Sequence, residues 1–135
     1  MDRILTSSTY RKAETQEELL ARYAYLMRRR YGATLYLFGS RARGTARPDS
    51  DYDLVAVSKA FQLHKRSARV LDRWTLWLEA GGWGRGLDLH CLTPEEFHEE
   101  TRYGWGYLGG SKKRGELMRI MVGSARRERS ARNGS

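Results

Sequence analysis

The sequence predicts an α/β fold of the α+β type, in which a mixed β-sheet is covered by helices. Apolar residues recur at helical spacing over residues 16–31. Three short apolar runs with the composition of strands follow at residues 33–38, 51–58 and 87–92. Helical patterns lie between and after these runs, so the element order is helix, strand, strand, helix, strand, helix. That order is typical of a mixed sheet with helices packed on it.

The first helix is predicted over residues 16–31. Thr15 followed by Glu18 fits a capping box at its start. Gly32 supplies the residue that ends many helices. Arginines at residues 28–30 suit the negative end of the helix dipole, which is a structural role.

Two strands and a turn are predicted next. A buried strand over residues 33–38 leads into a helical turn over 41–44, and a second strand covers residues 51–58. Successive side chains of a strand point to opposite faces, so Asp51 and Asp53 project from the same side.

The remaining elements are predicted from periodicity and caps. Apolar residues repeat at helical spacing within residues 64–80, and a strand follows over residues 87–92. Thr93 as a cap and Pro94 in the first turn predict another helix. The glycine-aromatic segment 103–110 has no clear period, so we expect a loop there.

Length and charge predict one domain with a basic extension. A chain of 135 residues supports a single core, which we assign to residues 1–110. Residues 111–135 carry eight Lys and Arg residues against two Glu residues, a net +6 of the total +9. We expect this extension to be partly disordered and solvated, with RNA contact as the alternative. The extension lacks the interleaved aromatic residues that stack on bases.

Composition also restricts the location of the protein. No stretch has the apolar length of a membrane span, and residues 1–12 lack the apolar centre of a signal peptide. The single cysteine, Cys91, cannot form an internal disulfide. We therefore expect a cytoplasmic protein without a membrane partner.

The end of the first strand has the residues of a phosphate-binding turn. Gly39 allows close approach of the backbone, and the N–H and hydroxyl of Ser40 can donate to phosphate oxygens. Asp51 and Asp53 follow on the next strand. Two carboxylates that face a triphosphate provide the oxygen ligands that Mg²⁺ requires. The sequence thus predicts a phosphate-binding turn beside a metal-binding strand.

These residues carry a resemblance to a known family. The run Gly39-Ser40-Arg41-Ala42-Arg43-Gly44, followed by Asp51-x-Asp53-Leu54, resembles the signature of the DNA polymerase beta-like nucleotidyltransferase superfamily. More narrowly, it is similar to the minimal nucleotidyltransferases, small proteins often paired with HEPN-domain proteins in toxin–antitoxin pairs. The resemblance covers residues from about 15 to 100 and implies the nucleotidyltransferase fold.

The resemblance implies a set of site residues. Three acids are expected to be catalytic and to bind two Mg²⁺ ions: Asp51, Asp53 and Asp88. Asp88 is expected to bind the metal that activates the acceptor and to take its proton, whereas the alternative is an ordinary solvent-facing strand acid. Four residues are expected to bind the nucleotide: Gly39, Ser40, Arg41 and Arg43. For either arginine, a surface salt bridge is an equally good interpretation. A histidine, His90, shares a face with Asp88 and is left out of the catalytic set.

The implied activity is Mg²⁺-dependent transfer of AMP from ATP to a hydroxyl group of a partner protein. The expected partner is a HEPN-domain toxin, for which this chain would be the antitoxin. Two alternatives stay open: a non-catalytic nucleotide-binding antitoxin that masks its partner, and transfer to RNA or a small molecule. Three intact acids argue against the first, and the lack of a second domain argues against the other. The sequence leaves the acceptor, the preferred base and the oligomeric state open.

Overall fold

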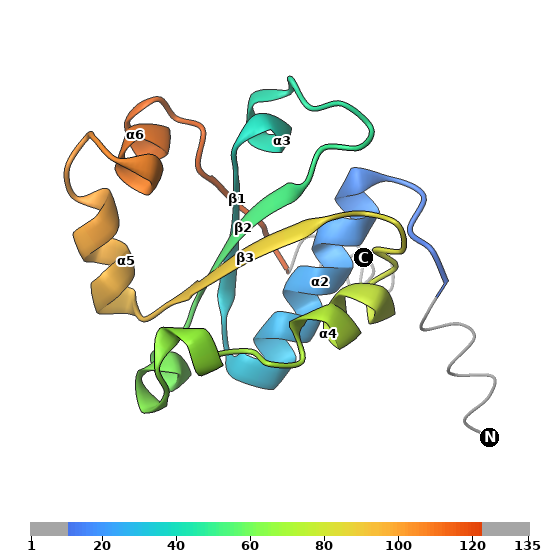
Figure 1. Cartoon of the computed structure of the whole chain (residues 1–135), viewed down its shortest axis with the longest axis horizontal. Coiled ribbons are helices and arrows are strands. Elements are labelled where there is room, and N and C mark those ends of the chain that lie inside the picture. The colour runs from blue at the N-terminus through green and yellow to red at the C-terminus, as the bar shows by residue number, and fades with distance from the viewer. Residues whose placement is uncertain (1–10, 123–135) are drawn as a thin grey trace, which may run out of the picture.

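The computed structural model describes residues 11–122, which form a four-stranded mixed sheet with helices on both faces (Figure 1). The strands are β1 (Thr34–Phe38), β2 (Tyr52–Val57), β3 (Leu87–Leu92) and β4 (Met118–Arg119). Their order in the sheet is β3-β2-β1-β4. Strand β2 is antiparallel to β1 and parallel to β3, and β4 is antiparallel to β1. The predicted mixed sheet is therefore confirmed.

Helices α2 (Gln16–Tyr31) and α4 (Arg73–Glu79) cover one face of the sheet, over the larger part of the core (Figure 1). The Trp77 side chain is fully buried there and meets the Tyr23 ring edge-on at a centroid distance of 4.9 Å. Leu54 and Ala56 of β2 point into this cluster. The apolar stripe of α2, predicted from its helical spacing, is the surface that packs here.

Helices α5 (Pro94–Thr101) and α6 (Tyr107–Lys113) cover the opposite face over a smaller cluster (Figure 1). Its buried residues are Phe38, Val55, Leu92 and Leu108. Strand β2 thus buries side chains on both of its faces, which accounts for its nearly continuous apolar run.

Local caps set the ends of two helices as predicted. The Thr15 hydroxyl oxygen accepts from the Glu18 N–H at 3.0 Å, and Gly32 ends α2 at φ 64°. The Glu18 carboxylate accepts from the N–H of Glu14, so the reciprocal half of the box is displaced by one residue. Helix α5 has a complete capping box at Thr93.

The predicted helix within residues 64–80 is wrong in its extent, because α4 begins only at Arg73. Two 3₁₀ helices, η1 (Lys59–Leu63) and η2 (Arg66–Ala68), precede it. Val70 then adopts φ 50°, a left-handed conformation that a β-branched residue rarely takes and that interrupts any helix. Val70, before α4, and Trp77, within it, are both buried. The apolar residues of two separate segments therefore imitated the spacing of one continuous helix.

The predicted loop over residues 103–110 is also wrong at its end, because α6 begins at Tyr107. The glycines of this helix are poor helix formers, so the sequence does not predict it. Gly109 is nevertheless required at its position by packing. A Cβ atom at Gly109 would lie 2.2 Å from the Tyr103 carbonyl oxygen. Only glycine lets α6 approach the preceding turn so closely.

Residues 111–122 belong to the folded domain: they complete α6 and supply the edge strand β4. The boundary placed at residue 110 falls inside α6, and β4 then pairs with β1. The Ile120 N–H donates to the Leu35 carbonyl oxygen at 2.8 Å. The predicted disorder of the basic extension concerns residues 123–135, which lie outside the described residues. None of the helices within residues 11–122 has both the length and the apolar character of a membrane span.

Candidate functional site

Two of the predicted acids face each other across neighbouring strands. Asp53 on β2 is in register with Asp88 on the parallel strand β3. In-register residues of paired strands project from the same face, so the two carboxyl groups meet. Burial raises the pKa of Asp53, and the negative charges of Asp88 and Asp51 raise it further. The crowded carboxylates make a site that favours a cation.

The third predicted acid lies at the edge of this pair. Asp51 is exposed and directly precedes β2, so it is not paired in the sheet as the longer predicted strand implied. Its carboxylate packs against Gly86, where a Cβ atom would lie 1.9 Å from Oδ1. The neighbouring Tyr52 N–H donates to the Gly86 carbonyl oxygen at 2.9 Å. Sequence reasoning missed Gly86, whose only signal was its position just before the strand of Asp88.

The predicted phosphate turn touches the acid pair. Gly39 follows β1 at φ 75° and ψ −158°, a conformation essentially restricted to glycine. A Cβ atom there would lie 2.3 Å from Asp53 Oδ2. Ser40 begins the short helix α3 (Ser40–Arg43), whose first hydrogen bonds end on the Gly39 carbonyl oxygen. The structure therefore brings Gly39 and Ser40 beside Asp53, while their contact with phosphate stays a prediction.

The two candidate arginines differ in how they are engaged. The Arg41 guanidinium donates to the Ser50 carbonyl oxygen at 2.7 Å and lies over the Tyr52 ring at 4.2 Å. It thus fixes the loop that leads to Asp51. Arg43 is 42% exposed, and among the described residues its one ion pair is a long one with Glu116, at 3.8 Å. Arg43 is the more available of the two for an anion, and nucleotide contact by either arginine stays a prediction.

Two further side chains lie at the site. His90 Nε2 lies 3.6 Å from Asp88 Oδ2 and, within residues 11–122, finds no hydrogen-bond partner although the atom is buried. The Tyr107 ring meets Phe38 edge-on at 5.0 Å. Tyr107 is more than half exposed, yet partial burial of its side chain raises its pKa, and the charges of Asp53 and Asp88 raise it further. Tyr107 could not be predicted as a site residue, because the segment around it has no clear period.

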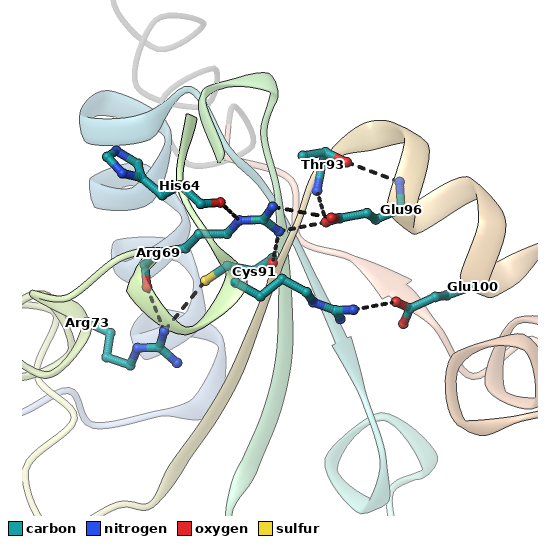
Figure 2. A network of polar contacts seen from close by, with 8 residues as sticks. His64, Arg69, Arg73, Cys91, Thr93, Glu96 and Glu100 are labelled. Atoms are coloured by element: carbon teal, nitrogen blue, oxygen red, sulfur yellow. Dashed lines mark hydrogen bonds and ion pairs between the residues drawn. The ribbon is translucent and has the colours of Figure 1, made fainter. Parts of the chain in front are cut away.

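An arginine network fixes the outer edge of β3 (Figure 2). The buried Arg69 donates to the Cys91 carbonyl oxygen at 2.9 Å and holds both oxygens of Glu96. Arg73 donates to the Leu89 carbonyl oxygen at 2.7 Å. These donors satisfy carbonyl groups of the edge strand that carries Asp88, which would otherwise be open to pairing.

The fit of the acids to a divalent cation follows from their chemistry. Among the described residues, no group of three or more His, Cys, Asp and Glu side chains is arranged to hold a metal ion unaided. Asp53 and Asp88 nevertheless supply hard oxygen donors whose mutual repulsion a cation would relieve. Mg²⁺ is commonly bound by one or two carboxylates together with substrate phosphates. The donor set fits such an ion, and the number of ions stays a prediction.

Comparison with known proteins agrees with this geometry. A family model described as a nucleotidyltransferase domain matches residues 20–120. The matched range includes all four strands, the Gly39 turn and the three acids. No curated protein and no solved structure is significantly similar to the chain.

Proposed function

Because the chain belongs to the nucleotidyltransferase domain family, we propose that it transfers AMP from ATP to a hydroxyl group of a partner protein. Membership in the family makes the chain a transferase of the nucleotidyl type, which uses a nucleoside triphosphate and generally a divalent metal. AMP as the transferred group and a protein as the acceptor are our proposal. The observation that supports nucleotidyl transfer at this site is the Asp53–Asp88 pair beside the Gly39 turn.

In the proposed reaction, the acceptor oxygen attacks the α-phosphorus, and the bond to the leaving pyrophosphate breaks. The Ser40 N–H and hydroxyl donate to the phosphates, and Arg43 offsets their charge. Asp53, Asp88 and Asp51 would hold the divalent cation. When bound, such a cation neutralises charge on the phosphates and the attacking oxygen. Asp88 accepts the proton of the acceptor hydroxyl.

The exposure of Asp88 supports a macromolecular acceptor. Its side chain is 52% exposed, on the edge strand of the sheet. A hydroxyl group on a large partner can therefore reach the acid from outside. The resemblance to minimal nucleotidyltransferases further supports a HEPN-domain protein as this partner, with a tyrosine as the modified residue. In that pair, the present chain is the antitoxin.

The test uses the chain, Mg²⁺, each of the four nucleoside triphosphates in turn, and the protein encoded by the neighbouring gene. Intact-mass spectrometry of the partner is expected to show added AMP, and little addition from the other three nucleotides. Peptide mapping is expected to place the group on a tyrosine. A tight complex without any added mass would support the masking antitoxin instead. In a parallel reaction with α-labelled ATP, the partner, total cellular RNA and a small-molecule extract, label found on RNA or a small molecule alone would contradict the protein acceptor.

A further inference from the structure

The turn between α5 and α6, together with the first residue of α6, exposes three aromatic side chains. Trp105 is 72% exposed, Tyr107 62% and Tyr103 47%. The Tyr103 and Trp105 rings stack on each other at 5.9 Å with an angle of 20° between their planes. Arg102 lies over the Tyr103 ring at 4.8 Å. Exposed apolar side chains gathered in this way mark interaction sites.

Cations border the same surface. A pocket of about 390 Å³ lies where α5 ends and α6 packs, and its lining includes Arg102, Tyr103, Lys112 and Lys113. The aliphatic part of Lys113 packs on Gly104, where a Cβ atom would lie 2.5 Å from Lys113 Cδ. Within residues 11–122, neither lysine has an acidic partner. We call Arg102, Tyr103, Trp105, Lys112 and Lys113 together the aromatic platform.

The platform is held in place by the fold. The close contact of Gly109 with the Tyr103 carbonyl oxygen locks α6 against the turn that carries the rings. Tyr107, two residues after Trp105, lies close enough to Asp53 and Asp88 for their charges to act on it. The platform therefore lies on a fixed surface that continues toward the acid pair.

We propose that the aromatic platform binds single-stranded nucleic acid, with bases stacked on Trp105 and Tyr103 and phosphates paired with Lys112 and Lys113. Exposed rings interleaved with cations are the usual construction of such surfaces, because every base has an aromatic face and every linkage carries a charge. A protein partner fits less well, because lysine is depleted from protein–protein interfaces. The net charge of +9 also favours association with a polyanion. Binding to the platform requires neither ATP nor transfer, so it goes beyond the proposed function.

The experiment measures binding of the full chain to a fluorescein-labelled oligouridylate of about 12 nucleotides, by fluorescence anisotropy without ATP or metal. Trp105→Ala is expected to weaken binding about 5- to 140-fold, the effect of losing one stacked base. The matched control is Trp74→Ala, which removes a half-exposed tryptophan of α4 on the opposite face and is expected to leave the affinity unchanged. Circular dichroism verifies that each variant is folded.

A second pair of variants tests the charges. Lys112→Gln/Lys113→Gln is expected to lower the slope of log affinity against log salt concentration by about 1.4, since each contact with a single strand contributes about 0.7. The comparison is Arg126→Gln/Arg127→Gln, in the same basic stretch of sequence. The proposal is overturned if the wild-type chain does not bind at about 50 mM salt. It is equally overturned if Trp105→Ala binds as the wild type does, or if only the Arg126/Arg127 variant loses affinity.

Discussion

Replacing Gly39 with alanine should damage the candidate site and the fold together. Gly39 has φ 75° and ψ −158°, a conformation that a non-glycine residue adopts at a cost of about 1–3 kcal/mol. The new Cβ atom would also lie 2.3 Å from Asp53 Oδ2. Restoring van der Waals separation requires the carboxylate to retreat by about 1 Å. A displacement of that size in the proposed catalytic acid should lower the rate about 100-fold.

The matched control for this change is Gly84→Ala. Gly84 has a similar φ of 73°, but nothing lies within 4 Å of the Cβ position. Urea unfolding should show a loss of about 1–2 kcal/mol for Gly84→Ala, from backbone strain alone, and a larger loss for Gly39→Ala. Label transfer from ATP labelled at the α-phosphate should fall only in Gly39→Ala, measured where both variants are folded. Equal transfer by the two variants would refute the contact between the turn and Asp53.

Three further predictions follow from the charges and the buried groups. Asp53→Asn should abolish transfer yet raise the free energy of unfolding in EDTA, because burial and neighbouring negative charges raise the pKa of Asp53. This gain in stability should disappear as the pH falls toward 3.8, where the native acid is also protonated. If the variant is no more stable than the wild type at neutral pH, the repulsion among the three carboxylates is contradicted. Arg69→Ala should cost about 3 kcal/mol in urea unfolding, against less than about 1 kcal/mol for the exposed Arg66→Ala. Arg69 lowers the pKa of Glu96 to about 2, so this pair stabilises the fold fully above about pH 4.5 and progressively less toward pH 2. A difference in unfolding free energy between the wild type and Glu96→Gln that does not change with pH would refute this stabilisation. Burial raises the pKa of Cys91 to about 11, so its thiol should react with Ellman's reagent slowly in the native protein and rapidly in urea. A rapid reaction of the native protein would contradict the burial of Cys91.

The parts of the fold that could be predicted from sequence are those fixed by local rules. Helix α2 has the predicted bounds because Thr15 and Gly32 cap it, and β3 has its predicted bounds because its alternation is local. The start of α4 depends on the conformation of Val70, which tertiary packing imposes. The start of α6 was hidden because it contains glycines, of which Gly109 is required by close packing on the turn before the helix.

The candidate site, like the fold, could be predicted from the sequence only where its residues lie close together in the chain. Residues within one motif, such as Gly39 and Asp53, were predicted from spacing, and the structure places them in contact. The register that sets Asp53 opposite Asp88 depends on which strands pair, which a single sequence does not determine. Gly86 and Tyr107 reach the site only through that pairing and through the packing of α6.

The most direct test of the central claim compares Asp88→Asn with Asp49→Asn in transfer of α-labelled AMP to the partner protein. Asp49 is an exposed acid in the loop before β2, so its replacement controls for the loss of one negative charge. We expect Asp88→Asn to abolish transfer while Mg²⁺-ATP binding stays measurable by calorimetry, and Asp49→Asn to transfer as the wild type does. Full transfer by Asp88→Asn would contradict the assignment of the acid pair as the catalytic centre.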